Sequence, residues 1–296
     1  SAILGIGLVL LGLRLGQFLS GPAAAGIAAV ATVSPTLLYA SRVADPQIAV
    51  AFFSLLALYA LLQLGTAARS AGAHSWWAAL AGAALAAGFA SAPSALTVYL
   101  CLAIAGIVEL ATNGSPDGAV RRMLSAFRTN PRVLPAMLGG MLVTLLALFS
   151  RLFSDPSALS GIGGTFADWG RLLSTATSTT PTQFFLLTIL LYEPLAVLFA
   201  IIGANRGTSG EQNGIGWPFF ATWFVTALLI FSFSSGRAPE QTVLIVLPLV
   251  LLGGAALGEI VASIDWLGPA RGRTWALMGA YFGLALAVIG FAVLLD

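Results

Sequence analysis

The 296-residue chain contains no lysine, one cysteine and one histidine, and only 8% of its residues are charged. Soluble domains carry about 25% charged residues, so this composition excludes an ordinary soluble domain. With Cys101 as the one cysteine and His74 as the one histidine, a disulfide within the chain and a Cys- or His-based metal cluster are both excluded. The formal net charge of +2 is too small to favour a nucleic-acid partner.

Apolar sequence is what the chain has in quantity, with 58% hydrophobic residues gathered in long, uniform runs. A run of about 20 apolar residues crosses a hydrocarbon core of about 30 Å as a helix. We therefore expect an all-α, polytopic transmembrane helical bundle that forms a single domain over residues 1–296. About ten spans are predicted, at 1–13, 22–40, 47–65, 76–91, 93–112, 133–153, 182–203, 216–234, 240–262 and 274–295.

The beginning of the chain bears on the first of these spans. Ser1 opens directly into an apolar run, and no signal peptide is recognisable. We therefore expect the first span to be truncated and sequence to be missing before Ser1.

Arginine is distributed unevenly between the two sides of the predicted bundle. One side holds Arg14, Arg69, Arg121, Arg122, Arg128, Arg132, Arg206, Arg271 and Arg273. The opposite side holds Arg42, Arg151, Arg171 and Arg237. Because short cytoplasmic loops carry an excess of positive residues, the first side is predicted to be cytoplasmic. The turn at 41–47 then faces away from the cytoplasm.

Two connections are long enough to have structure of their own. Segment 113–132 is predicted to be a cytoplasmic amphipathic helix whose arginines contact anionic lipid headgroups. Segment 154–181 is predicted to be a long extracytoplasmic loop, in which Asp155 and Pro156 begin a helix that lies along the membrane.

The turn at 41–47 carries three polar groups at a membrane surface. Pro46 disfavours helix for the residue before it, so one helix should end near Arg42 and the next begin near Pro46. Arg42 is suited to gripping a phosphate, with Asp45 and Gln47 as polar partners. The alternative is a plain interfacial turn, in which Arg42 reaches the headgroups and Asp45 caps the next helix.

Two further places carry candidate site residues. Glu193 is the one carboxylate well inside a predicted span, where an ionisable group usually faces a cavity or a partner; Pro194 beside it predicts a kink. The alternative is a structural, paired or protonated carboxyl. Arg237 and Glu240 flank a turn on the side of Arg42 and could join the same polar cluster, or form an ordinary surface turn.

Several motifs in the chain form a pattern with a consistent order and spacing. They are SPxxxYxSR at 34–42, AFFxLLALY at 51–59, DPxALxG at 155–161 with Trp169, LLYEPL at 190–195, and GRAP at 236–239 leading into LIVLPL at 244–249. This pattern, which covers most of residues 1–260, resembles the membrane glycosyltransferases of the GT-C class. It is closest to family 39 and to a related prokaryotic group known as flippase-activity-associated.

The resemblance implies a function. Such enzymes transfer a sugar from a polyprenyl-phosphate donor to a protein or lipid acceptor on the outer side of the membrane, and Arg42 would lie near the donor phosphate. Their turn usually reads Ser-Arg-x-x-Arg-x-Asp, whereas here the last positions are Asp45 and Gln47. A glutamine cannot act as a carboxylate base. The family's Lys-Glu pair is replaced by Ala92–Pro93, and its Gly-Glu-Lys-Met-Pro turn is shortened to Gly236–Pro239.

The predicted site has two groups of residues. The catalytic candidates are Asp45, Gln47 and Glu193, and the substrate-binding candidates are Arg42, Tyr39, Arg237 and Glu240. No metal ligands are assigned, and a divalent cation is expected only if the chain is active. The expected partners are membrane lipids, a polyprenyl-phosphate sugar if the chain is active, and other membrane subunits; nucleic acid is not expected.

Two functions remain open. The first is a glycosyltransferase that uses a lipid-linked sugar, with any further carboxylate supplied upstream of Ser1. The second is a catalytically degenerate relative that serves as a structural or accessory subunit of a larger membrane complex. The changes at Gln47 and Ala92–Pro93 favour the second for the mechanism, whereas the motif match favours the first, so the chain is expected to belong to the glycosyltransferase-like family.

Overall fold

The structure, a computed structural model, describes residues 1–66, 71–113, 115, 118–151, 154–174, 180–206 and 214–264. Every regular element within these ranges is a helix, which confirms the all-α class. In chain order they are α1 (Ala2–Gly16), α2 (Gly21–Val33), α3 (Pro35–Arg42), α4 (Pro46–Thr66), α5 (Ala71–Ser91), α6 (Ser94–Thr112), α7 (Ala119–Thr129), α8 (Val133–Phe149), η1 (Pro156–Ser160), α9 (Gly161–Ser174), α10 (Phe184–Tyr192), α11 (Pro194–Arg206), α12 (Trp217–Phe233), η2 (Pro239–Gln241) and α13 (Thr242–Ala262).

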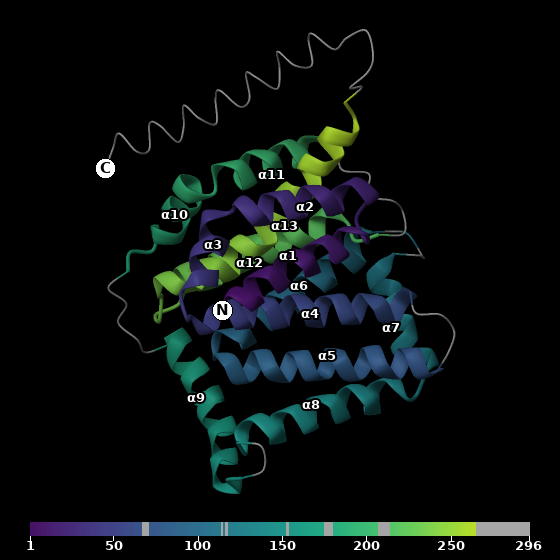
Figure 1. Cartoon of the computed structure of the whole chain (residues 1–296), viewed down its shortest axis with the longest axis vertical. Helices are drawn as coiled ribbons and strands as arrows, with labels where there is room; N and C mark the ends of the chain where they lie inside the picture. The colour runs from purple at the N-terminus through teal and green to yellow at the C-terminus, as the bar shows by residue number, and fades with distance from the viewer. Residues whose placement is uncertain are drawn as a thin grey trace.

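The bundle is organised around α13, in which every residue of 242–256 is buried. Helices α2, α11 and α12 pack against it, and α1 and α4 continue the bundle on the side of α2. Helices α5 and α8 then extend the bundle outward from α4, so that α8 lies at its edge (Figure 1). Of α8, only Val133 is buried, as expected for a helix that faces lipid.

The membrane character of the chain is borne out, but the count of about ten spans is not. Among the described residues, three helices are long and apolar enough to cross a membrane: Pro46–Thr66, Ser94–Thr112 and Pro239–Ala262. The number rises to as many as six if each of three bent helix pairs is one span. Helices α1 and α12 are apolar but shorter, and the predicted span at 274–295 lies outside the described residues.

Two predicted spans are broken where a proline follows a polar residue. The span predicted at 22–40 was wrong as a single helix: it divides at Ser34 into α2 and α3, which are inclined by 61°. The span predicted at 182–203 divides at Glu193 into α10 and α11 with a bend of 92°. A kink at Pro194 is therefore confirmed, but it is a full change of direction, because proline cannot continue the hydrogen-bond ladder.

The two ends of the bundle are built from different loops (Figure 1). At the hairpin end, which comprises residues 41–47, 91–94 and 234–241, the Ser94 hydroxyl donates to the Gln47 side chain at 2.6 Å. At the basic end, which comprises α7, residues 17–20 and 214–216, the Ile215 amide donates to the Phe18 carbonyl at 3.0 Å. The turn that holds Arg42 and the helix that holds Arg121 and Arg128 thus lie at opposite ends. Which end faces the cytoplasm stays a prediction.

The two long connections each contain a helix that crosses an end of the bundle (Figure 1). Helix α7 occupies the basic end and is bent by 96° from α8. Helix α9 occupies the hairpin end and follows η1, whose start Asp155 caps by accepting from the Ser157 amide at 3.1 Å. The helix start predicted at Asp155 is confirmed. The Trp169 indole ties α9 to the bundle by donating to the Thr97 hydroxyl at 3.0 Å.

Candidate functional site

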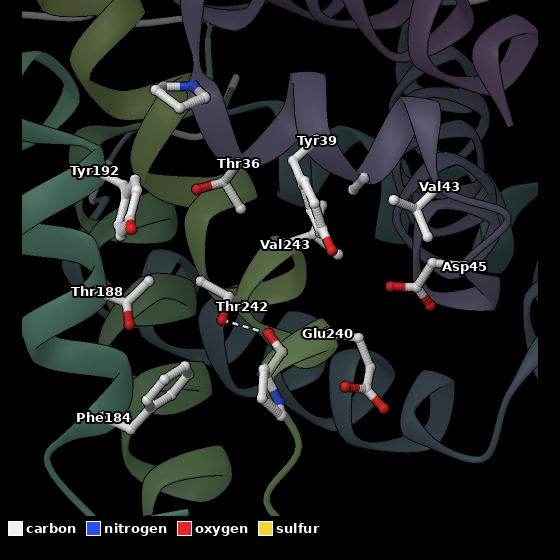
Figure 2. Close-up of a pocket in the computed structure, with 13 residues that line it drawn as sticks. Thr36, Tyr39, Val43, Asp45, Phe184, Thr188, Tyr192, Glu240, Thr242 and Val243 are labelled. Carbon is white, nitrogen blue, oxygen red and sulfur yellow. Dashed lines mark hydrogen bonds between the residues drawn. The ribbon is translucent and has the colours of Figure 1, made fainter.

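A cavity of about 760 Å³ opens at the hairpin end, between α3, α10 and the start of α13. It is lined by Pro35, Thr36, Tyr39, Ala40, Val43, Asp45, Phe184, Thr188, Tyr192, Pro239, Glu240, Thr242 and Val243. Figure 2 shows Asp45 and Glu240 at one side, Phe184, Thr188 and Tyr192 at the other, and Tyr39 between them. The cavity therefore has an acidic side and a largely aromatic side, and its volume is typical of small-molecule sites.

The walls of this pocket follow from two local sequence signals. At Ser34–Pro35 the serine hydroxyl accepts from the Leu37 amide at 3.3 Å, and proline takes the first helical position, so a new helix begins there. At Glu193–Pro194 the proline ends α10 and begins α11. The half-helices α3 and α10, each divided from its partner at one of these breaks, form two of the walls.

Three of the seven predicted site residues line the pocket: Tyr39, Asp45 and Glu240. They come from three different places along the chain, namely α3, the turn before α4, and η2. Arg42 is exposed and is not among the lining residues. The structure thus brings two of the three predicted carboxylates, Asp45 and Glu240, together and leaves the predicted phosphate-binding arginine outside the cavity.

The other three predicted residues are engaged within the protein. Gln47 is 8% exposed and accepts from the Ser94 hydroxyl. Glu193 is 3% exposed and accepts from the Ser34 hydroxyl at 2.6 Å. Arg237 donates to the backbone carbonyls of Thr180, Ser232 and Ser234. Each of these side chains therefore supports a wall or turn of the site.

The four pocket residues Thr36, Phe184, Thr188 and Tyr192 were not among the sequence predictions. Thr36 directly follows the break at Ser34–Pro35, and the other three precede the break at Glu193–Pro194 by less than three helical turns. A serine before a proline is a known helix-start signal, and it predicts a break at Ser34 that would have drawn attention to α3.

Asp45 is held in a partly apolar environment that changes its acidity. Burial, as the largest effect, raises the pKa of the Asp45 carboxyl, and the nearby Glu240 carboxylate raises it further. A hydrogen bond from the Gln47 amide at 2.9 Å acts in the opposite direction. That bond also makes Asp45 a cap of α4, as one sequence interpretation expected. A carboxyl that retains its proton to higher pH is suited to exchanging protons with a ligand.

Substituting Glu240→Gln is expected to lower the pH at which Asp45 titrates, because the like charge is removed. The midpoint should nevertheless stay above the ordinary value for aspartate, since burial is the larger cause. The titration is followed by isotope-edited infrared spectroscopy of the aspartate carbonyl band, with Asp45→Asn to assign the band. An unchanged midpoint in Glu240→Gln would show that the two carboxyls do not interact.

The pocket residues do not make a metal site by themselves. Within the ranges that the structure describes, no group of three or more His, Cys, Asp or Glu side chains is close enough to hold a metal ion. Asp45 and Glu240 supply two carboxylates, which is fewer protein ligands than a dedicated metal site uses.

Comparison with known proteins places the fold. No family model and no curated protein match the chain. Among solved structures, it is similar to ArnT from Cupriavidus metallidurans, whose crystal structure was determined bound to undecaprenyl phosphate. The TM-score is 0.68 at 15% sequence identity, and the match covers 96% of this chain and 48% of ArnT. The chain therefore has a GT-C-like fold and spans about half the length of that protein.

Proposed function

We propose that this chain is a GT-C-type membrane protein that binds a polyprenyl-phosphate sugar in the pocket between α3, α10 and α13. The observation that carries the proposal is the convergence of Tyr39, Asp45 and Glu240 in one cavity with an aromatic side. The aromatic side offers apolar area to an isoprenoid chain, and the acidic side offers hydrogen-bond acceptors to sugar hydroxyls. The fold shared with ArnT, which was crystallised with undecaprenyl phosphate, supports this ligand class.

In the proposed reaction, an acceptor hydroxyl attacks the anomeric carbon of the donor sugar. A carbon–oxygen bond forms to the acceptor, the bond from the anomeric carbon to the phosphate oxygen breaks, and the polyprenyl phosphate leaves. Asp45 takes the proton of the acceptor hydroxyl, for which its raised pKa suits it. Arg42, exposed just outside the pocket, pairs with the phosphate, and Glu240 and Tyr39 orient the sugar.

Filling the pocket should weaken binding of the lipid. In Thr188→Trp an indole would occupy the cavity, and the affinity for a short polyprenyl phosphate should fall by at least about tenfold, since the pocket loses volume that the ligand needs. Binding is measured by native mass spectrometry of the protein in nanodiscs, with the corresponding polyprenol and inorganic phosphate as comparison ligands. Leu148→Trp, on the exposed side of α8, is the matched control. Equal affinity in Thr188→Trp and Leu148→Trp would contradict the proposed site.

A second candidate function is that of an accessory subunit that keeps the fold but not the chemistry. It is favoured by the engagement of Gln47 and Arg237 in contacts within the protein. A transfer assay with a radiolabelled polyprenyl-phosphate sugar distinguishes the two, using wild type and Gln47→Asp. Product from either protein supports an enzyme, whereas lipid binding without product in both supports the accessory role.

The proposed chemistry places the hairpin end outside the cytoplasm of a prokaryotic plasma membrane. Because the chain has one cysteine and it is buried, Val43→Cys in a Cys101→Ala background gives a single accessible thiol at that end. This thiol should react with a membrane-impermeant maleimide in intact cells, while Ser125→Cys on α7 should react only after lysis. The reverse pattern would place the hairpin end in the cytoplasm.

A further inference from the structure

Two of the three bent helix pairs meet at their breaks, beside the pocket. The break between α2 and α3 lies at Ser34, and the break between α10 and α11 lies at Glu193. Residues 34 and 193 are in direct contact although 159 positions separate them in sequence. Both half-helices next to these breaks, α3 and α10, line the cavity. The contact between the two breaks therefore joins the ends of two helices that form pocket walls.

One carboxylate oxygen makes this connection. Oε1 of Glu193 accepts from the Ser34 hydroxyl at 2.6 Å and from the Thr36 amide at 3.0 Å. The Thr36 amide lies in the first turn of α3, where unpaired N–H groups and the helix dipole favour a negative group. The Ser34 hydroxyl in turn accepts from the Leu37 amide, so the N-terminus of α3 is held by Glu193 directly and through Ser34.

The backbone of the same residue joins the two halves of the other broken span. The Glu193 amide donates to the Ile189 carbonyl at 2.9 Å and closes the last turn of α10. Its carbonyl accepts from the Val197 amide at 3.0 Å and opens α11. One residue thus ends α10, begins α11 and caps α3.

The side chain of Glu193 does not line the cavity, but its neighbours do. Thr36 and Tyr39 follow the held end of α3, and Tyr192 and Thr188 precede Glu193 on α10. Glu193 itself is 3% exposed, so it cannot touch a ligand in the pocket without a change of structure. Any influence on the ligand must act through the placement of α3 and α10.

We propose that Glu193 is a positioning residue that holds α3 and α10 at the separation which the lipid-linked substrate requires. The ligand class in this statement rests on the proposed function, whereas the control of the α3–α10 separation rests on the hydrogen bonds alone. Glutamine at this position retains an oxygen that accepts from both donors, and alanine retains none. Pocket width and affinity should therefore follow acceptor capacity rather than charge.

The experiment measures the separation and the affinity in the same variants. Nitroxide labels on Leu38→Cys of α3 and Leu187→Cys of α10, both exposed and outside the pocket lining, report the separation by pulsed electron resonance in a Cys101→Ala background. In Glu193→Ala the distance distribution should broaden, and the affinity for a short polyprenyl phosphate should fall by about tenfold, since misplaced walls no longer fit the ligand. In Glu193→Gln the lipid affinity should stay within about threefold of that of wild type, and the distance distribution should match that of wild type.

The matched control is another buried carboxylate at the opposite end of the bundle. Glu109, 2% exposed, accepts from the Gly216 amide at 2.7 Å at the start of α12, so its loss also removes a buried helix cap. Glu109→Ala should lower the melting temperature but leave the α3–α10 distance and the lipid affinity unchanged. If Glu193→Ala does not fold, Ser34→Ala removes the 2.6 Å donor and serves for the same two measurements.

The outcomes separate this inference from the proposed function. An unchanged distance distribution in a folded Glu193→Ala or Ser34→Ala protein overturns the positioning role. A broadened distribution with unchanged lipid affinity overturns the link between the wall separation and the substrate. If wild type binds no polyprenyl phosphate, the proposed function fails, whereas a distribution that broadens in Glu193→Ala still supports the control of the wall separation.

Discussion

Substituting Gly140→Ala is expected to destabilise the bundle by about 2–3 kcal/mol, whereas Gly139→Ala, one residue earlier, should be neutral or slightly stabilising. A Cβ at position 140 would overlap the Ala79 carbonyl oxygen and lie 2.9 Å from the carbonyl carbon of that residue. A Cβ at position 139 would meet no atom within 4 Å. The obstacle at 140 is the backbone of α5, which cannot move aside as the tip of a side chain can.

The two variants differ by one position on the same helix, so they share expression, lipid and detergent effects. The free energy of unfolding is measured by SDS titration in mixed micelles. A cysteine cross-link between α5 and α8 further tests whether α8 separates from α5 in Gly140→Ala. Equal stabilities for the two variants would mean that α5 and α8 are not packed backbone to backbone.

Much of the fold could be predicted from the sequence, because few backbone structures can cross a lipid bilayer. Long apolar runs must form helices with internally satisfied backbones, so the class and most helix positions follow from hydropathy. The kink predicted at Pro194 was confirmed in position, because the missing N–H of proline acts locally, but the size of the 92° bend was not predicted. The break at Ser34 was missed because residues 22–40 are apolar enough overall to be one span, although Ser34–Pro35 is a helix-start signal. The pairing of helices such as α5 with α8 depends on close contacts between glycines and distant backbones, which periodicity does not reveal.

The site was accessible only in part, for a different physical reason. Asp45 and Glu240 could be predicted as neighbours, because both belong to turns on the same side of the bundle. The contact between Ser34 and Glu193 joins residues 159 positions apart, and no local pattern encodes such a pairing. A buried carboxylate indicates that a partner exists, but the partner is chosen by tertiary packing. The contacts of a polar residue decide whether it takes part in the chemistry or stabilises the structure around the site.

Arg237 illustrates that distinction, and its substitution is expected to have the second large effect. Its guanidinium donates to the Thr180 carbonyl at 3.0 Å, to the Ser232 carbonyl at 3.1 Å and to the Ser234 carbonyl at 3.0 Å. Two of these carbonyls lie at the C-terminal end of α12, where a cation also interacts favourably with the helix dipole. Arg237→Ala should therefore cost about 3 kcal/mol of unfolding free energy, since three acceptors of a charged donor lose their partner together.

Two control variants distinguish a structural role of Arg237 from direct binding of the substrate. Arg42→Ala removes an exposed arginine from the same end of the bundle and should change stability by less than about 0.5 kcal/mol. Arg237→Lys keeps the charge but not the planar fork, so it should recover only part of the loss. If Arg237 bound the phosphate directly, Arg237→Ala would weaken lipid binding while leaving the unfolding free energy near that of wild type.

We expect instead that Arg237→Ala lowers the unfolding free energy, and that the lipid affinity falls only as a consequence of this loss of stability. The turn that Arg237 holds leads within three residues to Glu240 on the acidic side of the pocket. Loosening the turn displaces the Glu240 carboxylate and so lowers the lipid affinity. In Arg237→Ala this affinity should recover when the folded bundle is stabilised by other means, for example by cooling. Arg42→Ala should behave in the reverse manner: because its effect is the loss of a charge at the phosphate, no gain in stability would restore its affinity.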